Sequence, residues 1–354
     1  MKFAILGAGS AGQGLASYLS LKGYDINLFN LRAGRLVPIR AKGGIKVSGV
    51  VEGFAQISKV TTDISEAIAD ADVIAITVRA YGHKKLLELC LPYLKDGQLV
   101  IFMTGYWASL RLRGLLDDVH CDVVLAETTL LPLVSEVVGP GEVRISGIKS
   151  KVKVAAFPST RTEEVLRLLK DVLPQLVAGK NVLETNLDNF NPIFHAPIAL
   201  FNLGALERIN NFEFYHQGVT LKIAEVIDSI DRERLKLAGE LELGLRPGTN
   251  SLKQYYGASG ESTYEIFKNC KAYKGYILPN VFDYVQEDVP YGLVPIASLC
   301  EFLNVPNRAT KSIISTWSLV DKIDYWEEGI TVRQLGLCDM GTLEIMEFVS
   351  TGRK

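Results

Sequence analysis

The sequence has little of what nucleic-acid binding, membrane crossing or secretion requires. The 354 residues carry a formal net charge of −2, so the basic excess of nucleic-acid-binding proteins is missing. No uncharged apolar run approaches the roughly 20 residues that span a bilayer. The first residues, MKFAILGAGS, lack the small-residue cleavage site of a secretory leader. We therefore expect no nucleic-acid partner and no membrane association.

Cysteine is sparse and scattered along the chain. Five cysteines occur, none in a CxxC pair: Cys90, Cys121, Cys270, Cys300 and Cys338. This spacing fits neither a disulfide framework nor a zinc site. We expect reduced thiols in a cytoplasmic protein that holds no metal.

Histidine is rarer still, with four residues in the chain. One of them, His195, begins the run HAPIALFN, whose apolar residues are typical of a buried helix. A histidine in such a place is either a hydrogen-bonded core residue or an acid/base group at the mouth of a site. The run alone does not decide between these alternatives.

Short apolar runs alternate with helical patterns through the first half of the chain. KFAILGAG, YDINLFN and ADVIAITVRA are typical of buried strands, and SAGQGLASYLSLKG has the spacing of a helix. This alternation predicts a parallel α/β sheet covered on both faces. From about Leu183 helical periodicity dominates. We therefore predict an N-terminal Rossmann, doubly wound sheet over residues 1–182 and an all-helical domain over residues 183–354, with a ligand cleft between them.

The three glycines of GxGxxG lie at the predicted junction of the first strand and the first helix. Gly7 makes the tight turn, Gly9 lets the backbone approach a pyrophosphate, and Gly12 lets the helix pack on the strand. Ser10 opens the helix, whose free N–H groups favour phosphate. The complete strand–turn–helix–strand context favours a dinucleotide site over a glycine-rich turn without a ligand.

The end of the second strand indicates which dinucleotide is bound. Enzymes that prefer NAD usually carry an acidic residue there, which bonds the ribose hydroxyl. This chain has Asn30 instead, followed by Arg32 and Arg35. Guanidinium groups hold a 2′-phosphate well, so we expect NADP to be preferred and NAD to remain possible. The alternative is that both arginines are only solvated surface residues.

The helical half resembles a known family in four segments that occur in the family's order. These segments are NPIFHAPIALFN, YGASGESTYEIFKN, AYKGYILPN and EDVPYGLVP. They resemble the opine dehydrogenases, the octopine/nopaline dehydrogenase family, and the resemblance runs from the glycine loop to LGLCDMG near the C-terminus. It implies a Rossmann domain followed by a helical domain. It also implies an enzyme that reductively joins an amino acid to a 2-oxo acid with NADH or NADPH.

The resemblance further implies that His195 is the catalytic histidine and Asp288 the aspartate that pairs with it. Physical chemistry agrees with such a pair. A carboxylate on one ring nitrogen orients the other nitrogen and stabilises the charged imidazole. The acid/base alternative for His195 is therefore preferred.

Three positions are candidates for the substrate site. Arg79 follows a predicted strand at the carboxyl edge of the sheet, as does His83, for which a surface loop is the alternative. Asn202 lies seven residues after His195, two helical turns on. In the family resemblance, Asp283 stands where pyruvate-specific members have a carboxylate-binding arginine.

Three explanations of Asp283 remain open. A local shift turns it to solvent, or Arg79 holds the carboxylate instead, or the substrate is cationic or neutral at this end. The second and third are preferred, because the flanking sequence aligns without a gap.

We therefore predict an NADP-dependent opine-type dehydrogenase whose partners are an amino acid or amine and a 2-oxo acid, with a homodimer as its possible assembly. Two alternatives are kept. One is a 2-oxo acid reductase without an amine partner, similar to ketopantoate or glycerol-phosphate enzymes. The other is a dinucleotide-binding sensor without turnover.

Overall fold

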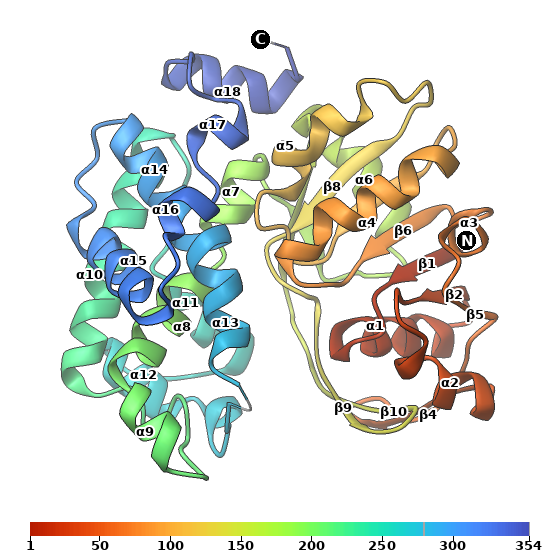
Figure 1. Ribbon diagram of the computed structural model, residues 1–354, viewed down its shortest axis with the longest axis horizontal. Coiled ribbons are helices and arrows are strands. Elements are labelled where there is room, and N and C mark those ends of the chain that lie inside the picture. The colour runs from red at the N-terminus through yellow and green to blue at the C-terminus, as the bar shows by residue number, and fades with distance from the viewer. Residues whose placement is uncertain (279, 354) are drawn as a thin grey trace. The chain divides into compact units, whose positions relative to one another are not determined.

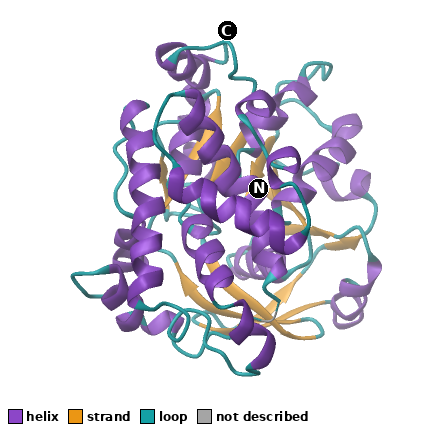
Figure 2. Ribbon diagram, turned by 60° about the vertical axis from the view of Figure 1, so that its left-hand side comes forward, coloured by secondary structure: helices purple, strands orange, loops and turns teal. Residues whose placement is uncertain are grey.

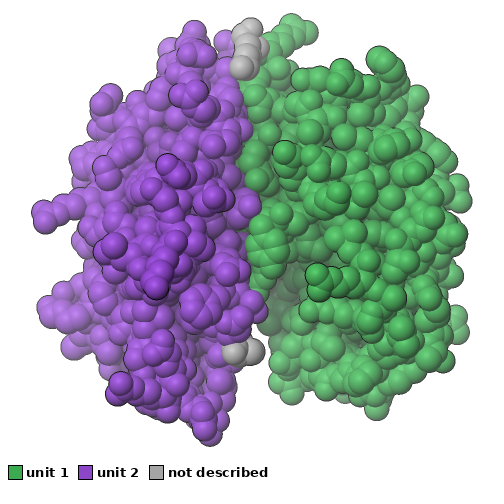
Figure 3. Space-filling model, in the orientation of Figure 1, with its two compact units in different colours: residues 1–185, 348–353 green, residues 186–347, 354 purple. Residues whose placement is uncertain are grey.

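The computed structural model describes residues 1–278 and 280–353, which fall into two units (Figure 3). Unit 1 consists of Met1–Thr185 together with Phe348–Arg353, and unit 2 of Asn186–Glu347. The strands β1 to β12 lie between Lys2 and Ala178 and therefore in unit 1, whereas unit 2 is built of helices (Figures 1 and 2). The predicted order, a parallel α/β domain followed by a helical domain, is confirmed.

The main sheet of unit 1 has eight strands in the order β12-β11-β8-β7-β6-β1-β2-β5. Neighbouring strands pair in parallel except β11, which runs antiparallel to β8. The strands are β1 (Lys2–Leu6), β2 (Asp25–Phe29), β5 (Lys59–Thr61), β6 (Val73–Ile76), β7 (Leu99–Phe102), β8 (Val124–Thr128), β11 (Val152–Phe157) and β12 (Leu176–Ala178). The carboxyl ends of the parallel strands therefore meet at one edge, where ligands bind in such sheets.

Both faces of this sheet are buried, and the reason is visible in β1. Phe3 and Ile5 pack into one apolar cluster, and Ala4 and Leu6 into another on the opposite face. Side chains alternate between faces along a strand, so a continuous apolar run supplies both cores at once. The α-helices that lie wholly in unit 1 are α1 (Ser10–Leu21), α2 (Val37–Lys42), α3 (Ile64–Ile68), α4 (His83–Cys90), α5 (Ala108–Leu112) and α6 (Thr162–Leu169).

Unit 1 also contains a second sheet that the sequence analysis missed. Its order is β4-β3-β10-β9, with β3 (Gly44–Gly49), β4 (Gly53–Gln56), β9 (Leu133–Gly139) and β10 (Glu142–Ile148). Helix α1 contacts β1 and β2 on one side and β4 and β9 on the other, so it packs between the two sheets (Figure 1). A Cβ at Gly14 would lie 2.3 Å from Ser135 Oγ, so this glycine allows the close approach of α1 to β9.

Unit 2 consists of helices. They are α8 (Asn191–Phe201), α9 (Leu203–Arg208), α10 (Leu221–Glu240), α11 (Gly248–Tyr256), α12 (Thr263–Asn269), α13 (Phe282–Asp288), α14 (Val294–Phe302), α15 (Arg308–Asp321), α16 (Tyr325–Glu328) and α17 (Val332–Leu335). A π-helical turn, Val289–Leu293, links α13 to α14. Two further helices, α7 (Val182–Leu187) and α18 (Thr342–Thr351), contain residues of both units. Among the described residues, no helix combines the length and apolar character that a bilayer crossing needs.

A buried ion pair on α10 holds three segments of unit 2 together. Arg234 is 1% exposed, and its Nε donates to Asp231 Oδ1 at 2.7 Å. The same guanidinium donates to the carbonyls of Leu187 and Arg246, each at 2.7 Å. The other carboxylate oxygen, Asp231 Oδ2, accepts from the backbone N–H of Gly248 at 2.8 Å. The pair therefore satisfies backbone groups at the end of α7, in the segment before α11 and at the start of α11, which the helices leave without a partner.

We predict that Arg234→Ala lowers the free energy of unfolding by about 3–5 kcal/mol, because Asp231 and two carbonyls then stay buried without their donor. Arg232→Ala is the matched control, since Arg232 lies exposed on the same helix, and it should cost under about 1 kcal/mol. Urea denaturation of the two variants measures both values. Equal losses in the two variants would contradict the role given to the buried pair.

Candidate active site

The glycine loop between β1 and α1 has no room for side chains at two of its glycines. Gly7 has φ +120°, and a Cβ there would lie 2.6 Å from Val78 Cγ1. A Cβ at Gly12 would lie 1.6 Å from the carbonyl oxygen of Gly7. The turn is therefore tight enough to direct the first N–H groups of α1 outward, which is the arrangement that binds a pyrophosphate. Ser10 is exposed, and its Oγ accepts a hydrogen bond from Val137 N at 3.2 Å.

Two of the three residues expected near the adenosine ribose lie beside this loop. Asn30 Oδ1 accepts from the N–H of Ala8 in the loop at 3.1 Å, and Asn30 Nδ2 donates to the carbonyl of Arg32 at 2.8 Å. Arg35 Nη1 lies 3.2 Å from where a Cβ would stand at Gly9. Arg32 and Arg35 are both exposed. The structure thus brings Asn30 and Arg35 to the glycine loop, with two guanidinium groups open to solvent.

The segment after β6 gives different positions to Arg79 and His83. Arg79 is partly buried and precedes a 3-10 turn, Ala80–Gly82, at the carboxyl edge of the sheet. His83 is fully buried, and its Nε2 lies 3.2 Å from the carbonyl oxygen of Val78. Burial, with a smaller effect of nearby Arg111, lowers the pKa of His83 to about 3. The surface-loop alternative for His83 is therefore wrong, and this neutral ring is a core residue.

The structure brings His195 and Asp288 together inside unit 2. His195 Nδ1 lies 2.8 Å from Asp288 Oδ2, and the two side chains are 8% and 2% exposed. An ionised carboxylate only accepts hydrogen bonds, so Nδ1 carries the proton and Nε2 is left as the acceptor in the neutral ring. The ring of Tyr284 stacks on the imidazole, with centroids 4.0 Å apart and planes 8° from parallel. The imidazole is thereby fixed in both tautomer and orientation.

Local sequence explains how the two residues meet. Tyr284 and Asp288 are four residues apart on α13, so they share the face that packs against α8. The π-helical turn that follows contains Gly292, where a Cβ would lie 2.3 Å from Pro192 Cγ. This glycine lets EDVPYG approach NPIFH at the turn of α8 that precedes His195. The two motifs are thus separated in the sequence but packed against each other.

Sequence reasoning missed the aromatic residues around His195. The hydroxyl of Tyr215 lies 2.9 Å from His195 Nε2. Tyr215 in turn stacks on Tyr273 with centroids 3.8 Å apart, and the hydroxyls of Tyr276 and Tyr284 are 2.6 Å apart. Tyr284 had a usable signal, its spacing of four from Asp288. Nothing in NNFEFYHQG singles out Tyr215, because it reaches the site only through the tertiary fold.

Two other predicted substrate residues lie outside this cluster of contacts. Asn202 follows α8, and its Nδ2 donates to the carbonyls of Ile198 at 2.7 Å and Gly218 at 2.9 Å. Asp283 lies in the first turn of α13, is exposed, and accepts from Asn280 Nδ2 at 3.1 Å. Asn202 therefore ties the end of α8 to a neighbouring loop, and Asp283 faces solvent in this structure.

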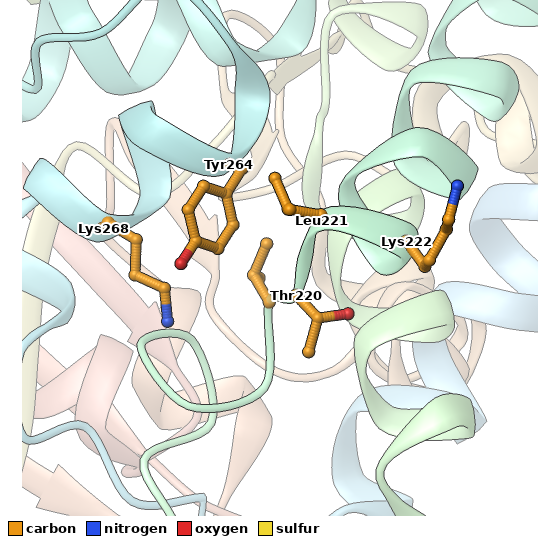
Figure 4. A pocket seen from close by; sticks show the side chains of 6 residues that line it. Thr220, Leu221, Lys222, Tyr264 and Lys268 are labelled. Atoms are coloured by element: carbon orange, nitrogen blue, oxygen red, sulfur yellow. The ribbon is translucent and has the colours of Figure 1, made fainter.

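A separate hollow of about 360 Å³ lies on unit 2 (Figure 4). Residues at the start of α10 and on α12 line it: Val219, Thr220, Leu221, Lys222, Tyr264 and Lys268. None of the predicted site residues is among them. In the described part of the chain, no group of three or more His, Cys, Asp or Glu side chains is arranged to hold a metal ion.

Two family models match different parts of the chain. The family model described as NAD/NADP octopine/nopaline dehydrogenase, alpha-helical domain, matches residues 178–320. The model described as ketopantoate reductase PanE/ApbA matches residues 3–159. The helical half therefore distinguishes this chain from a ketopantoate reductase, with which it shares the nucleotide-binding half.

Proteins that resemble this chain over nearly its full length include a named relative and two solved structures. The chain is 32% identical over 340 residues to an opine dehydrogenase of Arthrobacter sp. (strain 1C), covering 95% of each protein. Its fold matches that of octopine dehydrogenase in complex with NADH and agmatine, with a TM-score of 0.81 and 18% identity over 100% of this chain and 98% of the other. It also matches NADP+-bound yersinopine dehydrogenase, with a TM-score of 0.71 and 16% identity over 99% of each chain.

The relative from Arthrobacter is similar enough, over nearly the full length, to decide the family. The motifs around His195 and Asp288 and the order of the two domains agree with that decision. The protein belongs to the opine dehydrogenase family, NAD(P)H-dependent enzymes that reductively condense an amino acid with a 2-oxo acid.

Proposed function

We propose that His195 and Asp288 form the acid/base pair of this reductive condensation. The observation that carries the proposal is the 2.8 Å hydrogen bond between Nδ1 and Oδ2 in a buried environment. Asp288 orients the ring and stabilises its charged form, so the proton exchanged with the substrate oxygen enters and leaves through Nε2. The amine adds to the carbonyl carbon to give a carbinolamine, whose hydroxyl proton comes from the amine. The imidazolium gives this oxygen the second proton, with which it leaves as water when the imine forms.

The glycine loop fits the cofactor that supplies the hydride. Gly7, Gly9, Ser10 and Gly12 would hold its pyrophosphate, because the turn is too tight for a Cβ, which would meet Val78 at Gly7 and the carbonyl of Gly7 at Gly12. When bound, the nicotinamide supplies hydride for reduction of the imine. The residues of this chain then bind the nucleotide, orient His195 and move the proton.

We propose that the cofactor is preferably NADP(H). Solved relatives hold NADH in one case and NADP+ in another, so the fold accommodates both. The choice then depends on the residues beside the ribose. Asn30 carries no negative charge that would repel a 2′-phosphate, and the exposed Arg32 and Arg35 supply positive charge near the loop.

The substrates are proposed at the level of class, an amino acid or amine and a 2-oxo acid. The exposure of Asp283 supports the explanation in which this residue faces solvent. Arg79, at the carboxyl edge of the sheet, then stays the candidate for holding the substrate carboxylate, and Asn202 a weaker candidate for a substrate contact. Location in the cytoplasm and a homodimer remain predictions.

We predict that NADPH binds more tightly than NADH. Arg32→Ala and Arg35→Ala should each weaken NADPH binding by about 10-fold, because each removes a charge-assisted contact to the 2′-phosphate. NADH binding should hardly change. Fluorescence titration measures the dissociation constants, with the exposed Arg333→Ala in unit 2 as control. Equal affinities for the two cofactors in the wild-type protein would refute the preference.

We predict that His195→Ala lowers kcat about 100-fold or more, the usual contribution of general acid/base catalysis. Asp288→Asn should cost less, since the imidazole remains and loses only its orienting charge. The measurement is NADPH oxidation over a matrix of 2-oxo acids and amino acids. His120→Ala, which removes an exposed histidine of unit 1, should leave kcat unchanged.

Two outcomes of that assay would count against the proposal. Near-full activity of His195→Ala on the best substrate pair would remove the histidine from the acid/base role. Oxidation that proceeds equally well without the amine would instead indicate a simple 2-oxo acid reductase. Cofactor affinity should be the same in all these variants, because the pair lies outside unit 1.

A further inference from the structure

The nitrogen of His195 that acid/base chemistry needs already has a partner. Nδ1 is engaged with Asp288, so the proton must enter and leave through Nε2. The hydroxyl of Tyr215 lies 2.9 Å from that nitrogen. In the neutral ring the hydroxyl donates to Nε2, and in the charged ring Nε2–H donates to the hydroxyl oxygen. The hydroxyl of Tyr215 is therefore the hydrogen-bond partner of the nitrogen through which the proton must pass.

Tyr215 is held so firmly that its hydroxyl stays at this nitrogen. Its side chain is 5% exposed, and its ring stacks on Tyr273 with planes 13° from parallel. Phe214 meets the same ring edge-on, with centroids 4.9 Å apart. The backbone is fixed as well, because Phe214 N donates to the carbonyl of Tyr276 at 2.9 Å. Removing the hydroxyl from Nε2 would require the aromatic cluster to come apart.

The hydroxyl of Tyr215 is suited to transfer a proton from one group to another rather than to act as a base itself. Burial, with smaller effects of Tyr284, Tyr273 and other neighbouring tyrosines, raises the pKa of Tyr215 well above its ordinary value. The phenolate is therefore not formed at neutral pH, and Tyr215 is no base in its own right. A neutral hydroxyl can still accept one proton while it releases another.

We propose that Tyr215 relays the proton between His195 Nε2 and the substrate oxygen, an inference that rests on the proposed acid/base role of His195. The charged imidazole gives its Nε2 proton to the Tyr215 oxygen, and the hydroxyl proton passes to the substrate oxygen that leaves as water. The imidazole ends neutral, the substrate oxygen gains one proton, and Tyr215 is unchanged. In the reverse direction both protons move back.

The test is Tyr215→Phe, which keeps the ring and its stacking but removes the hydroxyl. We expect kcat to fall about 100-fold, while the KM of the 2-oxo acid and the dissociation constant of NADPH stay within about 2-fold. Tyr325→Phe is the matched control, because it removes a buried hydroxyl bonded to Asp321 elsewhere in unit 2. That variant should keep the wild-type kcat.

A measurement on the unmodified protein tests the relay without any substitution. Rates in mixtures of H₂O and D₂O should give a curved proton inventory, since two protons move in one step. The residual activity of Tyr215→Phe should give a straight one. A straight inventory in the wild-type protein, or no solvent isotope effect there, would overturn the relay.

The outcomes separate this inference from the role of His195. An inactive His195→Ala with a fully active Tyr215→Phe leaves the acid/base pair intact and overturns only the relay. A lowered KM with a raised kcat in Tyr215→Phe also overturns it, because the hydroxyl would then merely cover Nε2. Full activity in both variants would overturn both proposals.

Discussion

The hydrogen bond from His195 to Asp288 is the contact on which the proposed chemistry of unit 2 depends. It puts the proton on Nδ1 and leaves Nε2 to face Tyr215. The bond forms because α13 packs against α8, and Gly292 permits the close approach of the two segments at Pro192. Tyr284 then covers one face of the imidazole. The packing of α13 on α8 thus fixes the tautomer of His195, and with it the proposed proton path.

A comparable constraint governs unit 1, where the backbone geometry of the glycine loop, rather than a side-chain contact, determines where α1 begins. Gly12 must lie against the carbonyl of Gly7 for α1 to begin where it does. The same helix is packed between two sheets, so its N-terminus is held in place from both sides. A nucleotide phosphate placed there meets fixed N–H groups and loses little energy to reorganisation. In the proposed function the two units would therefore contribute different things, an anion site in unit 1 and an oriented acid/base group in unit 2.

Much of the fold could be predicted because its signals are local. Apolar runs of strand length and the GxGxxG turn indicate the parallel sheet, and the loss of alternation near Leu183 indicates the helical half. The second sheet was missed because its strands are partly exposed and because its two hairpins, β3–β4 and β9–β10, join only through the pairing of β3 with β10, which are far apart in the sequence. Periodicity within one segment carries no information about such pairing.

The residues of the candidate site likewise divide into those that sequence motifs indicate and those that only tertiary packing brings to the site. His195 and Asp288 were named from motifs that resemble a family, and their 2.8 Å contact spans 93 positions of sequence. Tyr215 was not named, since an aromatic residue in a loop segment has no pattern that points to a histidine 20 residues away. Asp283 was given a substrate role by its place in a motif, and its exposure depends on which face of α13 it occupies. Contacts made only by tertiary packing lie beyond sequence reasoning.

The tautomer of His195 in the ligand-free protein tests the central claim most directly. Nitrogen-15 NMR of histidine-labelled protein, with His195→Ala to assign the signal among the four histidines, reports which nitrogen carries the proton. The account predicts a neutral ring at high pH with the proton on Nδ1 and with Nε2 accepting a hydrogen bond. A neutral ring protonated on Nε2 would contradict it, because Asp288 would then not orient the imidazole and the proton path through Tyr215 would not exist.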